Sequence, residues 1–248
     1  MKKILKYILF FIFLFIFIFS GYKLFTFYQE DYKNEQLNQA IVNDFVQENI
    51  EFVEDKIEKE TVPISVDFED LKKQNKDIVG WIYQPNTKIN YPIVQGVDNN
   101  QYLRRTIYGK YSIAGSIFLD YRNDAKFEDF YSVLYGHHIK NNSMFGSLVH
   151  YKTQAYYNDN PIMYLLTPDK NYKIDIFMGF VQSANEDSIV YNTEITEENL
   201  EDILTLYKKS TFKSNILPGK GDKIICLSTC SYEYNNARYV VFGVLKGI

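Results

Sequence analysis

The segment most informative about the architecture reads Lys223-Ile224-Ile225-Cys226-Leu227-Ser228-Thr229-Cys230, an apolar run that ends in a polar tip carrying a cysteine. A second apolar run spans residues 239–245, and Arg238 stands at its head. Both runs are short and rich in β-branched and aromatic residues, and the polar linker 231–237 has the length of a hairpin loop. The pattern predicts two paired strands that hold a thiol and a guanidinium near one end.

An imidazole for this thiol is available far upstream, in Tyr135-Gly136-His137-His138. A cysteine nucleophile needs such a group near it in space rather than in sequence. If this segment is a strand, neighbouring side chains point to opposite faces, so only one of His137 and His138 faces the thiol. Arg238 cannot usefully lose a proton, so its predicted role is to hydrogen-bond a substrate carbonyl and stabilise the oxyanion that forms from it.

The two cysteines are not expected to form a disulfide. Cys226 and Cys230 stand four residues apart on one predicted strand, which separates their Cα atoms by about 13 Å. A disulfide bridges at most ~7 Å. Cys226 lies within the apolar run and is predicted to be a small core residue, whereas Cys230 at the polar end is the reactive thiol.

The N-terminus predicts a membrane anchor. Lys2, Lys3 and Lys6 precede an apolar run over residues 7–19, and residues 4–28 together are long enough to cross a bilayer. No small-x-small cleavage pattern follows, which disfavours the alternative of a cleaved signal peptide. Because the basic residues come first, we expect a protein of the cell membrane with a cytoplasmic tail (1–6) and a single transmembrane helix (7–28). The remainder of the chain is then extracellular.

The remainder divides into a stalk (29–62), with a helix over 30–59 that Pro63 ends, and one mainly β domain (63–248). The net charge of −4 without a basic stripe argues against a nucleic-acid partner. A helix is expected over 144–157, and an amphipathic helix capped by Thr196 is expected before the cysteine strand. The remaining expectations are a short helix over 67–75 and strands over 79–83, 91–94, 115–121, 130–135, 163–166 and 172–181.

Taken together, these motifs resemble the sortases, the membrane-anchored cysteine transpeptidases of Gram-positive surfaces. The resemblance is carried by Tyr135-Gly136-His137-His138 with Met144-Phe145 after it, by Leu227-Ser228-Thr229-Cys230 and by Arg238, and it covers roughly residues 67–245. The helix-bearing insertion, the N-terminal helices and the doubled histidine are similar to class B. Such a resemblance implies a closed eight-stranded β-barrel with peripheral helices, no required metal or other cofactor, and substrate proteins with a C-terminal sorting motif of the Asn-Pro-x-Thr type.

The resemblance also implies a site. Cys230 would form a thioester with the Thr carbonyl of the motif, and His137 would act as acid and base while the acyl group passes to a peptidoglycan amine. A backbone N–H near Ser231 would be a second oxyanion donor beside Arg238. Asn99, Leu103 and Ser228 are the expected substrate contacts.

Other interpretations remain open at this point. A hydrolytic cell-wall cysteine peptidase would be expected to carry its cysteine early, on a helix, with an Asp or Asn to orient the histidine. A non-catalytic adhesin would leave Cys230 unreactive. A zinc site built from the three histidines lacks the usual ligand spacing, so His138 and His150 are expected to be structural and Glu233 to lie on the surface.

Overall fold

The computed structural model describes residues 2–49, 62–184, 188–231, 233 and 235–248. The chain divides into two units, residues 1–40 and 41–248. Helix α1 (Lys2–Phe45) begins in the first unit, and its last five residues belong by sequence to the second. It is long and apolar enough to cross a membrane, by length and composition.

The predicted stalk helix over 30–59 is wrong in its bounds. Helix α1 runs without interruption from the apolar segment to Phe45, and not to Pro63. It is followed by the short strand β1 (Val46–Glu48), which pairs antiparallel with β2 (Ile64–Val66). The rest of the predicted helix, from residue 50 onward, lies outside the described residues.

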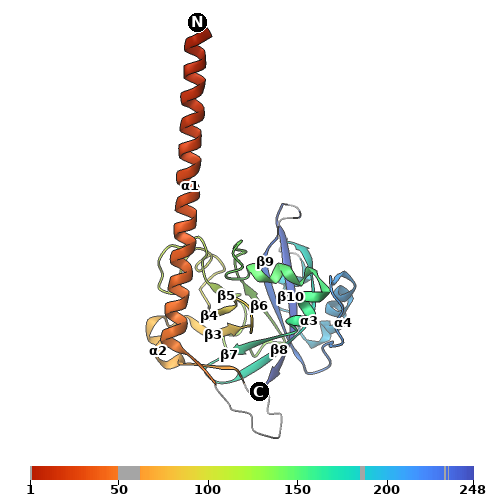
Figure 1. The fold of residues 1–248 in the computed structure, drawn as a ribbon. Helices are drawn as coiled ribbons and strands as arrows, with labels where there is room; N and C mark the ends of the chain where they lie inside the picture. Colours follow the sequence, from red (N-terminus) through yellow and green to blue (C-terminus); the bar gives the residue numbers. More distant parts are fainter. Residues whose placement is uncertain (1, 50–61, 185–187, 232, 234) are drawn as a thin grey trace. The chain divides into compact units, whose positions relative to one another are not determined.

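The second unit contains a closed eight-stranded β-barrel, as predicted (Figure 1). Around the barrel the strands follow the order β10-β8-β7-β3-β4-β5-β6-β9, and β9 closes it against β10. The pairs β4–β5 and β6–β9 are parallel. The strands are β3 (Ile78–Tyr83), β4 (Asn90–Val94), β5 (Ile117–Leu119), β6 (Tyr131–Tyr135), β7 (Ile162–Leu166), β8 (Asn171–Ser183), β9 (Lys223–Cys230) and β10 (Ala237–Gly247).

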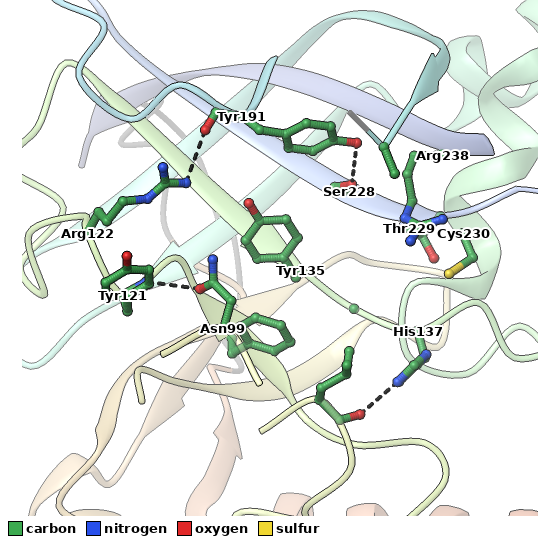
Figure 2. A pocket seen from close by; sticks show the side chains of 14 residues that line it. Asn99, Tyr121, Arg122, Tyr135, His137, Tyr191, Ser228, Thr229, Cys230 and Arg238 are labelled. Atoms are coloured by element: carbon green, nitrogen blue, oxygen red, sulfur yellow. Dashed lines mark hydrogen bonds between the residues drawn. The ribbon is translucent and has the colours of Figure 1, made fainter. Parts of the chain in front are cut away.

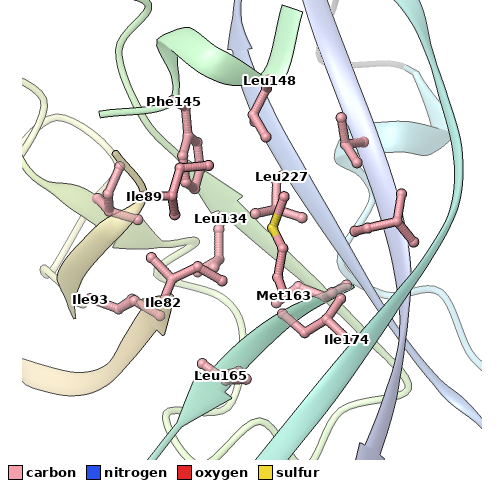
Figure 3. Close-up of a cluster of buried hydrophobic side chains, with 14 of the residues drawn as sticks. Ile82, Ile89, Ile93, Leu134, Phe145, Leu148, Met163, Leu165, Ile174 and Leu227 are labelled. Atoms are coloured by element: carbon pink, nitrogen blue, oxygen red, sulfur yellow. The ribbon is translucent and has the colours of Figure 1, made fainter. Parts of the chain in front are cut away.

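Alternating residues of these strands face two separate cores. On β9, Ile225 and Leu227 point into the barrel, where they join the side chains drawn in Figure 3. Ile224 and Cys226 point outward into a second apolar cluster. A strand buried on both faces reads as a continuous apolar run, which explains why the cysteine strand shows no polar alternation.

The outer cluster is covered by the insertion between β8 and β9. Ile203 of α4 (Leu200–Thr205) and Leu206 of η4 (Leu206–Lys209) are buried there, and Figure 1 shows α4 beside β8 and β10. The predicted amphipathic helix after Thr196 is confirmed as three consecutive helical pieces that begin with η3 (Glu197–Asn199). The other helices are α2 (Phe68–Gln74), η1 (Gly146–Lys152), α3 (Gln154–Asp159) and η2 (Ile189–Tyr191).

The helix predicted over 144–157 is present only in part. A 3₁₀ helix, η1, occupies its first half, and Thr153 then takes an extended backbone conformation and caps α3 through its side chain. Strand β5 is also shorter than predicted, because Gly115 takes a left-handed conformation (φ +61°) just before it.

Candidate active site

Cys230 and Arg238 lie opposite each other on neighbouring strands. Cys230 is the last residue of β9, Arg238 is the second residue of β10, and the antiparallel register pairs them directly. Side chains of directly opposed residues share one face of the sheet, with Cβ atoms about 4.5–5.5 Å apart. The hairpin therefore brings the thiol and the guanidinium together, as the sequence predicts (Figure 2).

His137 reaches the same place from β6, which runs parallel to β9. The register pairs Tyr135 with Ser228, and the amide of Gly136 donates to the Ser228 carbonyl at 3.1 Å. His137 follows Tyr135 by two residues, and Cys230 follows Ser228 by two residues. A Cβ at position 136 would lie 2.5 Å from Cδ1 of Ile117 and 2.6 Å from Cδ2 of Phe145, so glycine before His137 leaves room for these two side chains against the backbone.

The two histidines lie beyond the end of β6, so strand alternation is the wrong reason for their divergence. The side chain of His137 lines the cavity beside Cys230. His138 instead hydrogen-bonds through Nδ1 to the Cys230 carbonyl at 3.0 Å. His150 is bonded through Nε2 to Oδ1 of Asn142 at 3.0 Å. Among the described residues, no group of three or more His, Cys, Asp or Glu side chains is arranged to hold a metal ion.

The hydrogen bonding of His137 fixes its tautomer. Its Nε2 lies 2.7 Å from the Leu103 carbonyl, which can only accept, so Nε2 carries a proton. Burial lowers the pKa of His137 below its usual value, and the positive charges of Arg104 and Arg238 lower it further, against the raising effect of the bond to Leu103. The ring is therefore neutral at pH 7, and Nδ1 is the atom free to accept a proton.

Cys226 provides an internal comparison for Cys230. Both are free thiols on the same face of β9, because residues four apart on a strand point the same way. Cys226 is fully buried beneath the outer cluster, and burial raises its pKa to about 12. Cys230 is only partly buried and lines the cavity. The outer apolar cluster covers Cys226 but not Cys230, which leaves Cys230 accessible to reagents in solution.

A cavity of about 360 Å³ extends from these three residues along the outer face of β5, β6 and β9. Tyr191 and Ser228 form one wall and share a hydrogen bond of 3.3 Å between their hydroxyl groups. Burial raises the pKa of Tyr191 to about 12, so this hydroxyl stays protonated at neutral pH. Asn99 lies across the cavity from them (Figure 2), and Leu103 also lines the cavity.

Asp120, which is fully buried, bonds several residues that line the far end of the cavity. Its carboxylate accepts hydrogen bonds from Nε and Nη2 of Arg122 (2.9 and 2.8 Å), Nδ2 of Asn99 (2.9 Å) and the Tyr135 hydroxyl (2.9 Å). Burial alone would raise the pKa of Asp120, but these donors lower it overall, so the group stays ionised. Sequence reasoning missed this network. The only signal was an acidic residue at the end of a buried strand with an arginine two positions later.

The expected substrate contacts Asn99, Leu103 and Ser228 line the cavity, whereas Ser231, expected to contribute beside them, does not. The amide of Ser231 donates to the Ala237 carbonyl at 2.9 Å, so this N–H is paired within the hairpin. The backbone oxyanion donor expected near Ser231 stays a prediction. Its side chain faces away from the cavity, toward Lys152 and Glu233. An amide one residue past the end of a strand can still pair with the opposite strand of the hairpin. The spacing of residues in the sequence does not show whether it does.

Comparisons with known proteins identify the family. The sortase domain model matches residues 82–246. Sortase B of Staphylococcus aureus (strain NCTC 8325 / PS 47) is 31% identical over 226 residues, which cover 91% of this chain and 89% of that protein. Sortase B of Listeria monocytogenes serovar 1/2a (strain ATCC BAA-679 / EGD-e) is 38% identical over 180 residues, which cover 71% and 72%.

Solved structures agree with the sequence relatives. A Staphylococcus aureus sortase B–substrate complex superposes with a TM-score of 0.68 and 32% identity, covering 73% of this chain and 85% of that one. A sortase B complexed with triglycine has a TM-score of 0.67 and 32% identity, covering 73% and 86%.

Proposed function

The chain belongs to the sortase family as a class B sortase, a cysteine transpeptidase, and from this premise we propose that it cuts a C-terminal sorting motif of the Asn-Pro-x-Thr type and transfers the protein to a peptidoglycan amine. The observation that carries the proposal is the direct pairing of Cys230 with Arg238, with His137 arriving beside them from the parallel strand. Membership of this enzyme family argues against the adhesin interpretation.

In the first half-reaction, the Cys230 proton passes to Nδ1 of His137 and the thiolate attacks the Thr carbonyl of the motif. Arg238 donates hydrogen bonds to the oxyanion that develops. His137, now an imidazolium, gives its proton to the amide nitrogen that leaves with the C-terminal tail. A thioester on Cys230 remains.

In the second half-reaction, an amine of a cell-wall peptide attacks the thioester. His137 takes the proton from the attacking nitrogen, and Cys230 leaves as the thiolate. The new amide bond joins the surface protein to the peptidoglycan, whereas attack by water would give hydrolysis alone. The triglycine complex of a relative supports an amine-bearing glycine peptide as the acceptor class.

Substrate binding is proposed for the cavity beside Cys230. Asn99, Leu103 and Ser228 combine an amide, an apolar side chain and a hydroxyl along one groove. A motif that carries Asn, Pro and Thr presents matching groups. A Staphylococcus aureus sortase B has been solved with its substrate bound, which supports a substrate site in this fold.

We further propose that the first unit anchors the enzyme in the cell membrane. Residues 7–28 of α1 form the apolar part of the helix, and Lys2, Lys3 and Lys6 precede it. The positive-inside rule then puts the N-terminus in the cytoplasm and the domain 63–248 outside the cell, where sorting substrates and cell-wall amines are found.

The test is a transfer assay with a peptide that contains the motif, run with and without triglycine and analysed by mass spectrometry. We expect the peptide to be cut after Thr and the triglycine-linked product to replace the hydrolysed one when the amine is present. Hydrolysis that triglycine does not divert would support the cysteine peptidase alternative instead. Cys230→Ala serves as the inactive control.

A further inference from the structure

The second histidine, His138, contacts the backbone of Cys230 rather than its thiol. His138 Nδ1 lies 3.0 Å from the Cys230 carbonyl oxygen. A carbonyl can only accept, so Nδ1 of His138 bears a proton and donates it. This bond joins the residue next to the proposed base to the backbone of the proposed nucleophile.

The segment that carries His138 is closely folded. The Phe145 amide donates to the His137 carbonyl at 3.1 Å, and His138 forms an antiparallel bridge with Met144. A Cβ at position 146 would lie 2.2 Å from the Ile139 carbonyl oxygen, so only glycine allows this approach. His138 therefore projects from a fixed turn rather than from a free loop.

The hairpin loop after Cys230 is tied to the same segment. Nζ of Lys152, at the end of η1, bonds the Ser231 hydroxyl at 3.1 Å and pairs with Glu233. The Lys152 ammonium also lies 5.5 Å from the centre of the Tyr239 ring. These contacts hold Ser231 and Glu233, whereas His138 bonds the Cys230 carbonyl itself.

From this geometry we infer that His138 is a positioning residue, whose hydrogen bond to the Cys230 carbonyl sets the place of the thiol relative to His137 and Arg238. The inference rests on the proposed roles of those three residues. Small displacements at a reacting centre are costly, since about 1 Å can reduce turnover on the order of 10²-fold.

The charge state of His138 suits a constant hydrogen bond. Burial lowers the pKa of His138, charge interactions with Lys152 and His150 lower it further, and the bond to Cys230 and the negative charge of Glu233 raise it. The ring is neutral at pH 7 and keeps its proton on Nδ1. Both the neutral and the protonated ring keep a proton on Nδ1, so the donor stays in place.

Two substitutions at His138 separate positioning from general packing. The amide nitrogen of an Asn side chain stands close to where Nδ1 stands, so His138→Asn keeps a donor for the carbonyl, whereas His138→Ala removes it. We expect His138→Ala to lower kcat for a motif peptide roughly 10- to 100-fold with KM changed less than about two-fold. His138→Asn should stay within about three-fold of the unaltered enzyme.

His150→Ala is the matched control, because it removes a histidine hydrogen bond from the same segment without touching Cys230. It should leave kcat unchanged. Thermal unfolding of all three variants shows whether a lower kcat results from a less stable fold. Equal loss in His138→Asn and His138→Ala, or full activity in His138→Ala, would overturn the inference.

A second readout does not depend on the sorting reaction. The rate of Cys230 alkylation by iodoacetamide is followed against pH, with the modified peptide mapped to exclude Cys226. We expect His138→Ala to shift this profile and His138→Asn and His150→Ala to leave it in place. An unshifted profile in His138→Ala contradicts positioning, while failure of the unaltered enzyme to cut any motif peptide would count against the proposed function alone.

Discussion

At the scale of single residues, the two cysteines differ in cover rather than in direction. Both point outward from β9, but the apolar cluster over Cys226 stops short of Cys230. We therefore expect Cys230→Ala to abolish cleavage of a motif peptide with the fold intact. Cys226→Ala should keep most activity and lower the free energy of unfolding by about 1 kcal/mol, as for other small core truncations.

Activity assays and urea unfolding of the two cysteine variants check this expectation. A loss of activity in Cys226→Ala comparable to that in Cys230→Ala would contradict the assignment of the nucleophile.

Arg238 is expected to act through the geometry of its donors. Loss of an oxyanion donor costs on the order of 10²–10³ in turnover, and a lysine cannot reproduce the planar fork of an arginine. Arg238→Lys should therefore lose most of the activity that Arg238→Ala loses. Peptide cleavage and alkylation of Cys230 are measured side by side, and near-normal turnover of the Lys variant would mean that only positive charge matters.

His137 is expected to titrate below its usual pKa, because burial and the charges of Arg104 and Arg238 disfavour the imidazolium. Arg104→Gln should raise the pKa of His137, measured by NMR titration. Arg105→Gln is the control, since Arg105 is not among the causes of the shift. An identical His137 titration in Arg104→Gln and the unaltered protein would contradict the electrostatic account.

The same shift has a consequence for stability. The pKa of His137 in the folded protein lies below the value of about 6.5 in the unfolded chain. The unfolded state therefore binds the proton first as pH falls. The contribution of His137 to stability is complete above pH ~6.5 and declines as pH drops toward the folded pKa.

At the scale of elements, the insertion between β8 and β9 acts as a lid on the outer face of the barrel. Ile203 of α4 is buried in the cluster that also contains Cys226. Ile203→Ala should lower the free energy of unfolding by about 2–5 kcal/mol and speed alkylation of Cys226. Glu201→Ala, exposed on the same helix, should change stability by less than about 0.5 kcal/mol. Equal stability of the two variants would contradict the role of the insertion as cover.

Elements with a strong local signal were predictable from sequence. The cysteine hairpin, the insertion helix after Thr196 and most barrel strands follow from apolar runs and capping residues. The end of α1 at Phe45 was missed, because the loose helical spacing of apolar residues continues past it. The Asp120 network was missed because Asn99 and Tyr135 reach Asp120 from other segments of the chain, and one sequence does not show which segments meet.

At the scale of the whole molecule, the chain combines a β-barrel enzyme with an N-terminal apolar helix. The full chain should remain in the membrane fraction after carbonate extraction, and deletion of residues 2–28 should release it. Protease added to intact cells should reach the catalytic domain, because the positive-inside rule puts it outside. Recovery of the full chain with an uncleaved N-terminus from the soluble fraction would contradict the proposed anchor.

The central claim is that Cys230 carries the acyl group between the two half-reactions. Its most direct test is mass spectrometry of the enzyme quenched in acid during turnover of a motif peptide without an acceptor amine. The account predicts an adduct equal to the N-terminal part of the peptide through Thr, mapped to the peptide that contains Cys230 and discharged when triglycine is added. Cleavage of the motif peptide with Cys230 unmodified, or an adduct mapped to Cys226, would contradict it.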